Sequence, residues 1–280
     1  MHTRLLVLVG TLACVGCHGN SSTGPGPISA SGTNYYVAAQ ESGADNDRCD
    51  GKSPTNQGNG NCPFRDFTAT KPLHLLDSAK GVTLFVRQGT YTLTQGIDVN
   101  GVGSSEADRV TVTAYQNEAV VFDGRNSPRE LMTVSGQYVT VQGITFQNAA
   151  GYNLEVRGAK QVIIERNRFL ANGTSDSLKG DGGAADVTVR DNEFTQWDSQ
   201  AIDVAGASRW TIERNRIHDP KGIEAKAIGV KFGSRDVTIT NNEFSNTYGL
   251  SLGGTSSPHT NNFEAYNLSV RDNTSPLRLL

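Results

Sequence analysis

The stretch GIEAKAIGVKFGSRD, residues 222–236, places a glutamate and two lysines within a few residues of one another. Elimination across a glycosidic bond begins with removal of the proton next to a sugar carboxylate, and that proton is hardly acidic until the carboxylate is neutralised. Such a site needs a cation or strong donors on the carboxylate, and a base such as a lysine with a lowered pKa. Glu224, Lys226 and Lys231 are therefore the residues whose types and spacing suit chemistry on a uronic-acid polymer.

Hydrolytic chemistry finds less support in the sequence. Glycoside hydrolysis uses two carboxylates placed across the scissile bond. β-Helix hydrolases of the polygalacturonase type carry a paired Asp-Asp and a Gly-His-Gly, and this chain contains neither motif. The acidic row of adjacent aspartates typical of one pectate-lyase type is missing as well.

A sequence repeat predicts the strands that position these residues. The hexamers IERNRF, VRDNEF, IERNRI and ITNNEF begin at Ile164, Val189, Ile212 and Ile239. Their asparagines lie 25, 23 and 27 residues apart, a spacing typical of repeat architectures. Each hexamer ends an alternating apolar stretch, and no helical pattern lies between the copies. We therefore predict an all-β, single-stranded parallel β-helix, a solenoid with one rung per repeat.

Stacked rungs place equivalent residues about 4.8 Å above one another. The repeated asparagines are expected to form a ladder of side-chain amides at one corner of the coil, and they are Asn167, Asn192, Asn215 and Asn242. The residues two places further on are expected to stack in the core, and they are Phe169, Phe194, Ile217 and Phe244. The asparagines are interpreted as structural, not as ligands.

The first residues read as a targeting signal. A charged MHTR precedes the apolar run LLVLVGTLACVG, which is too short to span a membrane. The run ends at Cys17 and resembles a bacterial lipoprotein signal. That resemblance implies that residues 1–17 form the signal, that Cys17 is lipidated and that residues 18–33 are a flexible tether. It places the protein in the bacterial cell envelope, outer membrane-anchored or extracellular, and touching the membrane only through its lipid; an ordinary cleaved signal is the alternative.

Two further features concern the N-terminal part of the fold. Cys49 and Cys62 are the only cysteines left after the signal, and an isolated pair in an oxidising compartment predicts a disulfide. Residues 71–80 predict a short helix with Pro72 near its start and apolar residues along one face. We expect this helix to cap the N-terminal end of the coil.

The stretches NYYVAAQESGAD, CPF, VTLFVRQGTYTL and RVTVTAYQNEAVVFDG resemble the start of secreted right-handed parallel β-helix proteins of the pectate-lyase-like superfamily. The resemblance covers roughly residues 34–273 and implies one right-handed β-helix domain over residues 34–280. This fold carries lyases, hydrolases, epimerases and adhesins, so it does not decide the activity. NLSVRDN, residues 267–273, starts a further rung with no cap after it, as a C-terminally truncated coil would show.

Residues 222–236 resemble the catalytic segment of chondroitinase B and of alginate-lyase-type β-helix enzymes. The resemblance implies that Lys231 is the catalytic base and that Glu224 is the first calcium-binding acid. Lys226 stands where the second calcium acid is expected, so calcium as a cofactor rests on Glu224, and Lys226 could itself neutralise a substrate carboxylate. The arginine of the next rung is absent from GLSLGGTSS.

The alternation of inward and outward residues along a strand, together with the cost of burying a charge, predicts where Lys231 points. Counted back from the glycine that ends each strand, Lys231 shares an offset with inward-facing residues of other rungs, and a lysine inside the coil would be costly. We therefore predict a one-residue bulge that buries Val230 and Phe232 and turns Lys231 outward. Lys231 would then lie near Asp203 and Glu155, which are candidates for substrate binding.

Weaker candidates lie outside this segment. His218 could serve as an acid, although loop histidines are usually bystanders, and Trp197 could stack on a sugar ring. Trp210 starts a strand at an inward position and is expected in the core.

The composition narrows the class of partner. The 280 residues carry a net charge of −3, which argues against a nucleic-acid partner. We expect a monomer whose partner is an acidic polysaccharide. The favoured function is that of a polysaccharide lyase, and the alternative is a non-catalytic carbohydrate-binding or adhesin-like surface protein.

Overall fold

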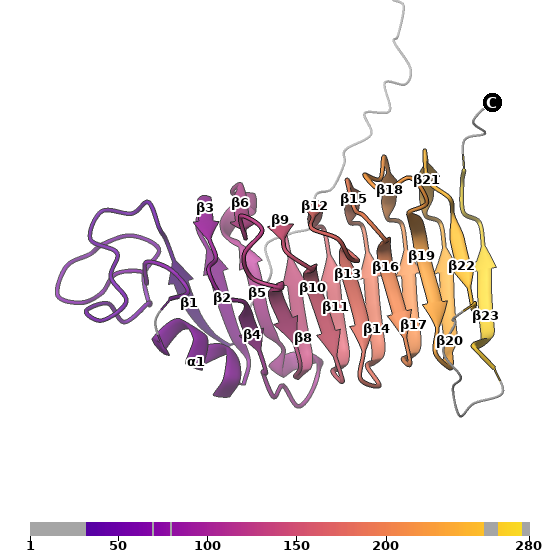
Figure 1. The fold of residues 1–280 in the computed structure, drawn as a ribbon. Coiled ribbons are helices and arrows are strands. Elements are labelled where there is room, and N and C mark those ends of the chain that lie inside the picture. The colour runs from indigo at the N-terminus through magenta and orange to yellow at the C-terminus, as the bar shows by residue number, and fades with distance from the viewer. Residues whose placement is uncertain (1–31, 69, 79, 255–262, 276–280) are drawn as a thin grey trace, which may run out of the picture.

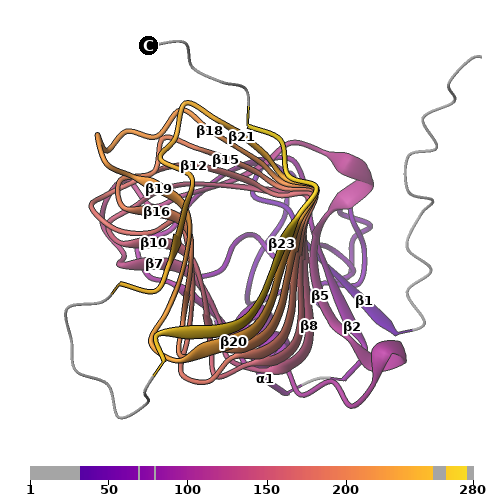
Figure 2. The same cartoon turned by 90° about the vertical axis from the view of Figure 1, so that its right-hand side faces the viewer.

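The computed structural model of the chain describes residues 32–68, 70–78, 80–254 and 263–275. Over these ranges the chain winds into a parallel β-helix, and successive turns add strands to three parallel sheets (Figure 1). The view turned by 90° shows the strands of each sheet stacked behind one another around a common interior (Figure 2). The predicted all-β solenoid is confirmed.

Each sheet is named here by its strands in spatial order. Sheet A contains β1 (Thr33–Val37), β2 (Val82–Val86), β5 (Val110–Ala114), β8 (Gln137–Gln142), β11 (Lys160–Glu165), β14 (Ala185–Arg190), β17 (Ser208–Glu213), β20 (Ser234–Thr240) and β23 (Ala265–Arg271). Sheet B contains β3 (Gly89–Thr92), β6 (Val120–Asp123), β9 (Ile144–Ala149), β12 (Arg168–Asn172), β15 (Glu193–Thr195), β18 (Arg216–His218) and β21 (Glu243–Ser245). Sheet C contains β4 (Ile97–Val99), β7 (Glu130–Val134), β10 (Tyr152–Arg157), β13 (Leu178–Asp181), β16 (Gln200–Ala205), β19 (Lys226–Lys231) and β22 (Leu250–Leu252).

Helical structure in the described residues is short. The helix α1 spans Thr70–Ser78, close to the predicted residues 71–80, and two 3₁₀ turns span Glu106–Asp108 and Tyr115–Asn117. Leu76 of α1 is fully buried in the core cluster, and α1 lies at the N-terminal end of the coil beside β4 (Figure 1). The helix therefore covers the end of the coil, as the sequence predicts.

Alternation along the strands builds the core. Ile164, Val189, Ile212 and Ile239 lie opposite one another in consecutive strands of sheet A, and all four are fully buried. In sheet B the predicted aromatic column is present, and the rings of Phe169 and Phe194 stack with their centroids 4.6 Å apart. The period of two in the sequence thus becomes a continuous apolar interior, which is the main stabilising contribution in such a fold.

The repeated asparagines form the predicted ladder. The side-chain amide of Asn167 donates to Oδ1 of Asn192 at 3.2 Å, Asn192 donates to Asn215 at 3.0 Å, and Asn215 donates to Asn242 at 2.9 Å. Each of these Oδ1 atoms also accepts a backbone N–H from the rung before it. Residues preceding the asparagines adopt left-handed backbone angles, such as Arg166 with φ of 53°. The phrase is repeated because it satisfies buried polar groups where the chain turns a corner.

Cys49 and Cys62 are bonded, with their Cα atoms 5.0 Å apart, which confirms the predicted disulfide. Closing a loop with a sequence separation of 13 residues stabilises the fold by about 3 kcal/mol on the chain-entropy model.

The ends of the domain differ slightly from expectation. The strand β1 begins at Thr33, so the last residue of the predicted tether 18–33 belongs to the fold. The signal segment, Cys17 and most of the tether lie outside the described residues. The further rung predicted at residues 267–273 is present as β23. No helix of the described part of the chain is long and apolar enough to cross a membrane.

Candidate functional site on the outer face of sheet C

A row of polar side chains runs along the outside of sheet C. Glu155 lies opposite Lys179, Lys179 opposite Asp203, and Asp203 opposite Gly229. These positions alternate with the fully buried core residues Val156 and Val204, so the row faces away from the coil interior. Glu155 and Asp203 therefore belong to one outward-facing row of sheet C.

Lys231 points outward, as predicted, because Val230 beside it is fully buried and lies opposite Val204. The backbone feature that turns Lys231 outward is not the expected bulge. Between β19 and β20 the turn holds one more residue than the preceding turn, so Phe232, with φ of 59°, takes the left-handed corner position that Gly206 holds one rung earlier. Phe232 is half-buried instead of lying in the core, which corrects that part of the prediction. An extra corner residue leaves the strand ladder intact, whereas a bulge would interrupt it.

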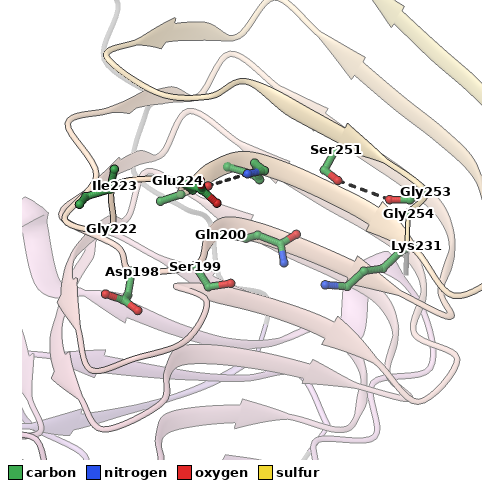
Figure 3. Close-up of a pocket in the computed structure, with 12 residues that line it drawn as sticks. Asp198, Ser199, Gln200, Gly222, Ile223, Glu224, Lys231, Ser251, Gly253 and Gly254 are labelled. Atoms are coloured by element: carbon green, nitrogen blue, oxygen red, sulfur yellow. Dashed lines mark hydrogen bonds between the residues drawn. The ribbon is translucent and has the colours of Figure 1, made fainter. Parts of the chain in front are cut away.

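Lys231 lies at the edge of an open hollow of about 480 Å³ (Figure 3). Gln200 and Lys226 lie opposite each other in adjacent strands of its floor, and Ser251 lies on the next strand. The loop Gly222–Ala225 forms one wall and Gly253 and Gly254 another. Lys226 Nζ donates to the carbonyl oxygen of Glu224 at 2.7 Å and lies 5.2 Å from the Tyr248 ring centroid.

The lysine is anchored to a fully buried carboxylate. Lys231 Nζ lies 3.1 Å from Asp203 Oδ1, and only 22% of the Lys231 side chain is exposed. The Gln200 side chain, with its amide oriented to satisfy both neighbours, donates to Asp203 Oδ1 at 3.1 Å and accepts from Lys231 Nζ at 2.9 Å. A side chain on Gly229 would collide with Gln200, so the glycine leaves room for this bridge. The sequence-predicted pair of Lys231 and Asp203 is thus in direct contact.

Two further charged side chains, Lys179 and Asp176, lie in the rung next to the hollow. Lys179 is in short contact with Asp203, and its Nζ lies 3.8 Å from Asp176 Oδ2. Burial, with a smaller contribution from the charge of Asp203, raises the pKa of Asp176 to about 7 against the opposing charges of Lys179 and Lys231. Burial lowers the pKa of Lys179, but the charge of Asp203, the hydrogen bond to it and the charge of Asp176 together outweigh burial, so the pKa lies above its usual value. We call Asp176, Lys179, Asp203 and Lys231 the buried charge cluster.

Comparison with known proteins places the chain in a family. A family profile described as right handed beta helix region matches residues 95–274. The chain belongs to this right-handed β-helix family. No curated protein sequence matches the chain.

Among solved structures, an alginate lyase from Paenibacillus sp. str. FPU-7 is 15% identical with a TM-score of 0.60, and the match covers 72% of each chain. The pectate lyase Pel9A is 16% identical with a TM-score of 0.50, and the match covers 88% of this chain and 78% of that chain. At these identities the likeness of this right-handed β-helix protein to the two lyases shows the fold alone.

The hollow does not fit a calcium ion. Calcium takes six to eight oxygen ligands, usually with several carboxylates among them. Glu224 and Asp198 line the hollow, but Lys226 stands beside Glu224, and Lys221 lies 3.7 Å from Asp198. Within the described ranges no three His, Cys, Asp or Glu side chains gather closely enough to hold a metal. Lys226 and Lys231 are the cationic side chains that line the hollow.

Glu155 lies outside the Lys231 contact. It is two strands away from Asp203 along the row, and its carboxylate pairs with Arg157 at 2.6 Å. Burial raises the pKa of Glu155, and the hydrogen bond from Arg157 opposes this. The structure thus separates the two acids that the sequence grouped.

Neither of the two weaker candidates lines the hollow. Trp197 is fully buried, so its predicted stacking on a sugar is wrong; its ring N–H donates to the Lys226 carbonyl at 2.8 Å and fixes the start of β19. His218 lies in sheet B, where its ring nitrogens contact Asp219 at 2.8 Å and Glu193 at 2.9 Å. Trp210 is in the core, as predicted.

Sequence reasoning missed Lys179, Asp176 and Gln200. Lys179 carried a usable signal, because it precedes Gly182 by the same three residues that separate Asp203 from Gly206 and Glu155 from Gly158. Asp176 and Gln200 carried none, since they lie where strands of unequal length begin.

Proposed function

We propose that the chain binds a uronic-acid-containing polysaccharide in the hollow over β16, β19 and β22 and cleaves it by β-elimination. The observation that supports this most is Lys231, which is held at the edge of an open hollow by a fully buried aspartate. Strongly desolvated charges held beside a hollow are costly to fold and are concentrated at functional sites. An alginate lyase and a pectate lyase share this fold, and the proposal assigns this chain the same class of chemistry.

The proposed reaction assigns a role to each lysine. Lys226 neutralises the substrate carboxylate, which makes the proton on the adjacent carbon more acidic. Lys231 first releases its ammonium proton to solvent and then, as the amine, accepts the proton from the substrate carbon. The electron pair left on carbon forms a carbon–carbon double bond as the bond to the glycosidic oxygen breaks. The leaving oxygen takes a proton from solvent, so one product carries an unsaturated uronate and the other a free hydroxyl.

Exposed ring surfaces at the rim suit a sugar chain. Tyr248 is 63% exposed and Ile223 is 88% exposed, and both lie at or beside the loop wall of the hollow. Aromatic faces stack on the apolar faces of sugar rings. We propose that Tyr248 supports the sugar ring whose carboxylate meets Lys226.

A second candidate function follows from the same ion pair. Lys231 and Asp203 in contact form a cation held by its counter-ion, and such a cation suits binding a carboxylate. The alternative is therefore a non-catalytic carbohydrate-binding surface protein that uses the same hollow.

We further propose export to the bacterial cell envelope with lipidation of Cys17. The disulfide between Cys49 and Cys62 supports an oxidising compartment. Replacement of Cys17 by serine should release the folded protein from the membrane fraction; retention there would contradict lipidation.

The deciding experiment incubates the full-length protein with a panel of uronic-acid polymers, with and without calcium, and follows the ultraviolet absorbance of the unsaturated product. The proposal expects absorbance to rise with one class of polymer and to be independent of added calcium. Binding without any rise, measured by calorimetry on the same panel, would support the non-catalytic alternative. Neither binding nor cleavage of any acidic polymer would contradict both.

A further inference from the structure

Asp176 lies in the rung next to the floor of the hollow, yet no part of the proposed reaction uses it. The N–H of Ser177 donates to the Gln200 carbonyl at 2.9 Å, and the N–H of Ser199 donates to the Ser175 carbonyl at 3.1 Å. These bonds fix Asp176 beside the two floor residues Ser199 and Gln200. Asp176 is only 5% exposed, and its Oδ1 accepts no hydrogen bond from the described residues.

The charges around Asp176 come from several strands. Lys179 of β13 lies 3.8 Å away, and Lys179 contacts Asp203 of β16, which in turn holds Lys231 of β19. From β10, Tyr152 has its ring centroid 6.0 Å from Lys179 Nζ, and Glu155 lies opposite Lys179 but pairs with Arg157. Asp198, before β16, is paired with Lys221. Asp176 is therefore the carboxylate of the cluster with an unsatisfied oxygen.

The protonation of Asp176 fixes the net charge of the cluster. With Asp176 ionised, two carboxylates balance two ammonium groups and the charge is zero. With Asp176 protonated, the charge is +1, and Asp203 alone must balance Lys179 and Lys231. Burial of a carboxylate with an unsatisfied oxygen favours the protonated form. The pKa of Asp176, raised by burial to about 7, places the change near neutral pH.

We propose that Asp176 is a positioning residue that sets, by gaining or losing one proton, how strongly Lys231 is available to a carboxylated sugar in the hollow. This rests on the proposed function of the hollow. When Asp176 is protonated, Asp203 is the only carboxylate that balances the charge of Lys179, and its attraction to Lys231 is weaker. The cluster beside the substrate also gains one positive charge. By linkage, binding of an acidic sugar must then favour protonation of Asp176, so the protein takes up a proton from solvent when it binds.

The test measures binding of the shortest uronic-acid oligomer that binds without being cleaved, at pH 6 and pH 8, by calorimetry in two buffers of different ionisation enthalpy. For the wild type we expect the affinity to be on the order of tenfold weaker at pH 8, the effect of one charge several ångströms away at a protein surface. We also expect net proton uptake on binding near pH 7. Proton uptake needs no variant, so the test does not depend on a mutant that folds.

Asp176→Asn should bind with nearly equal affinity at both pH values, close to that of the wild type at pH 6, and without proton uptake. Asp181→Asn is the matched control, because it removes an acid from the same sheet that faces Arg157 at 3.9 Å and not Lys231. Glu155→Gln separates the contribution of the other buried acid on this face. Both controls should keep the pH dependence and the proton uptake.

Two outcomes are distinguishable. Binding by the wild type that is independent of pH and takes up no proton, or an Asp176→Asn variant that keeps both effects, would overturn this inference and leave the proposed function standing. No binding of any acidic oligomer by the wild type at either pH would overturn the proposed function and this inference together.

Discussion

Sheet C carries two hollows of similar size that are built in different ways. The C-terminal hollow, of about 480 Å³, has Lys231 and Lys226 on its floor, and the N-terminal hollow, of about 410 Å³, is lined by Asp98, Arg129, Glu130 and Arg157 among others. In the first, the charge is anchored on Asp203, which is fully buried. In the second, the arginines are exposed, Arg129 by 65% and Arg157 by 52%.

The difference separates charges that cost solvation free energy on folding from charges that do not. Exposed ion pairs such as that between Arg157 and Asp181 contribute at most about 1 kcal/mol and need little explanation. A buried cluster loses several kcal/mol of solvation per ion, which its internal contacts must offset. Similar volume therefore does not mean similar function, and the C-terminal hollow is the stronger candidate for chemistry. Glu155 is the buried exception near the N-terminal hollow, where Arg157 covers it.

The largest expected difference between the hollows is in activity. Lys231→Ala should lower the initial rate of cleavage at least about 100-fold, because it removes the proposed proton acceptor. Arg157→Ala should leave the rate on short substrates within a few-fold of the wild type. Rates are measured by the absorbance of the unsaturated product, and the melting temperature of each variant controls for folding. Equal losses in both variants would refute the distinction.

Stability should separate the hollows next. Asp203→Ala leaves Lys179 buried without its main counter-ion and should lower the free energy of unfolding by about 3–5 kcal/mol. Arg129→Ala removes an arginine that is 65% exposed from Glu130, which is 18% exposed, and should change it by about 1 kcal/mol. Denaturant unfolding of the two variants provides the comparison, and a small effect at Asp203 would mean that the cluster is more hydrated than its burial indicates.

The pH dependence of stability should reveal Asp176. Its folded-state pKa of about 7 lies above the ordinary value of 3.8, so the protonated form is favoured by the fold. The stabilisation is complete below about pH 4 and is lost as the pH rises towards and through 7, by at most about 4 kcal/mol. Asp176→Asn should therefore lose less stability than the wild type between pH 5 and pH 8. Parallel pH curves for the two proteins would show that Asp176 is already ionised at pH 5.

The smallest expected effect concerns substrate length. From β4 to β19 the strands span five steps of about 4.8 Å, roughly 24 Å, so only a long oligomer lying along sheet C can reach both hollows. Arg157→Ala should weaken binding of such long oligomers by about threefold and leave short ones unchanged, in line with the value of an exposed charge. A length series titrated against wild type and variant checks this, and an effect on short oligomers would place Arg157 in the C-terminal site.

The sequence by itself determined the architecture. The spacing of Asn167, Asn192, Asn215 and Asn242 predicted the rungs, because a solenoid repeats the same corner and the same buried column at every turn. Strand parity placed Lys231 at an inward offset, and the cost of burying a lysine led to the prediction that it faces outward. The disulfide between Cys49 and Cys62 was predicted from the isolated cysteine pair that remains outside the N-terminal signal-like segment.

Only the tertiary structure decided the site. Asp176, Lys179 and Asp203 meet because stacked rungs of unequal length bring residues about 25 positions apart into contact. The strand register depends on turns that differ in length by a single residue, as in the turn with one additional residue at Phe232 and Gly233. Whether Trp197 is a sugar platform or a core residue depends on loop packing that periodicity does not encode. The charge state of Asp176 depends on burial and on neighbours from three other strands, and a linear sequence specifies neither until the coil is stacked.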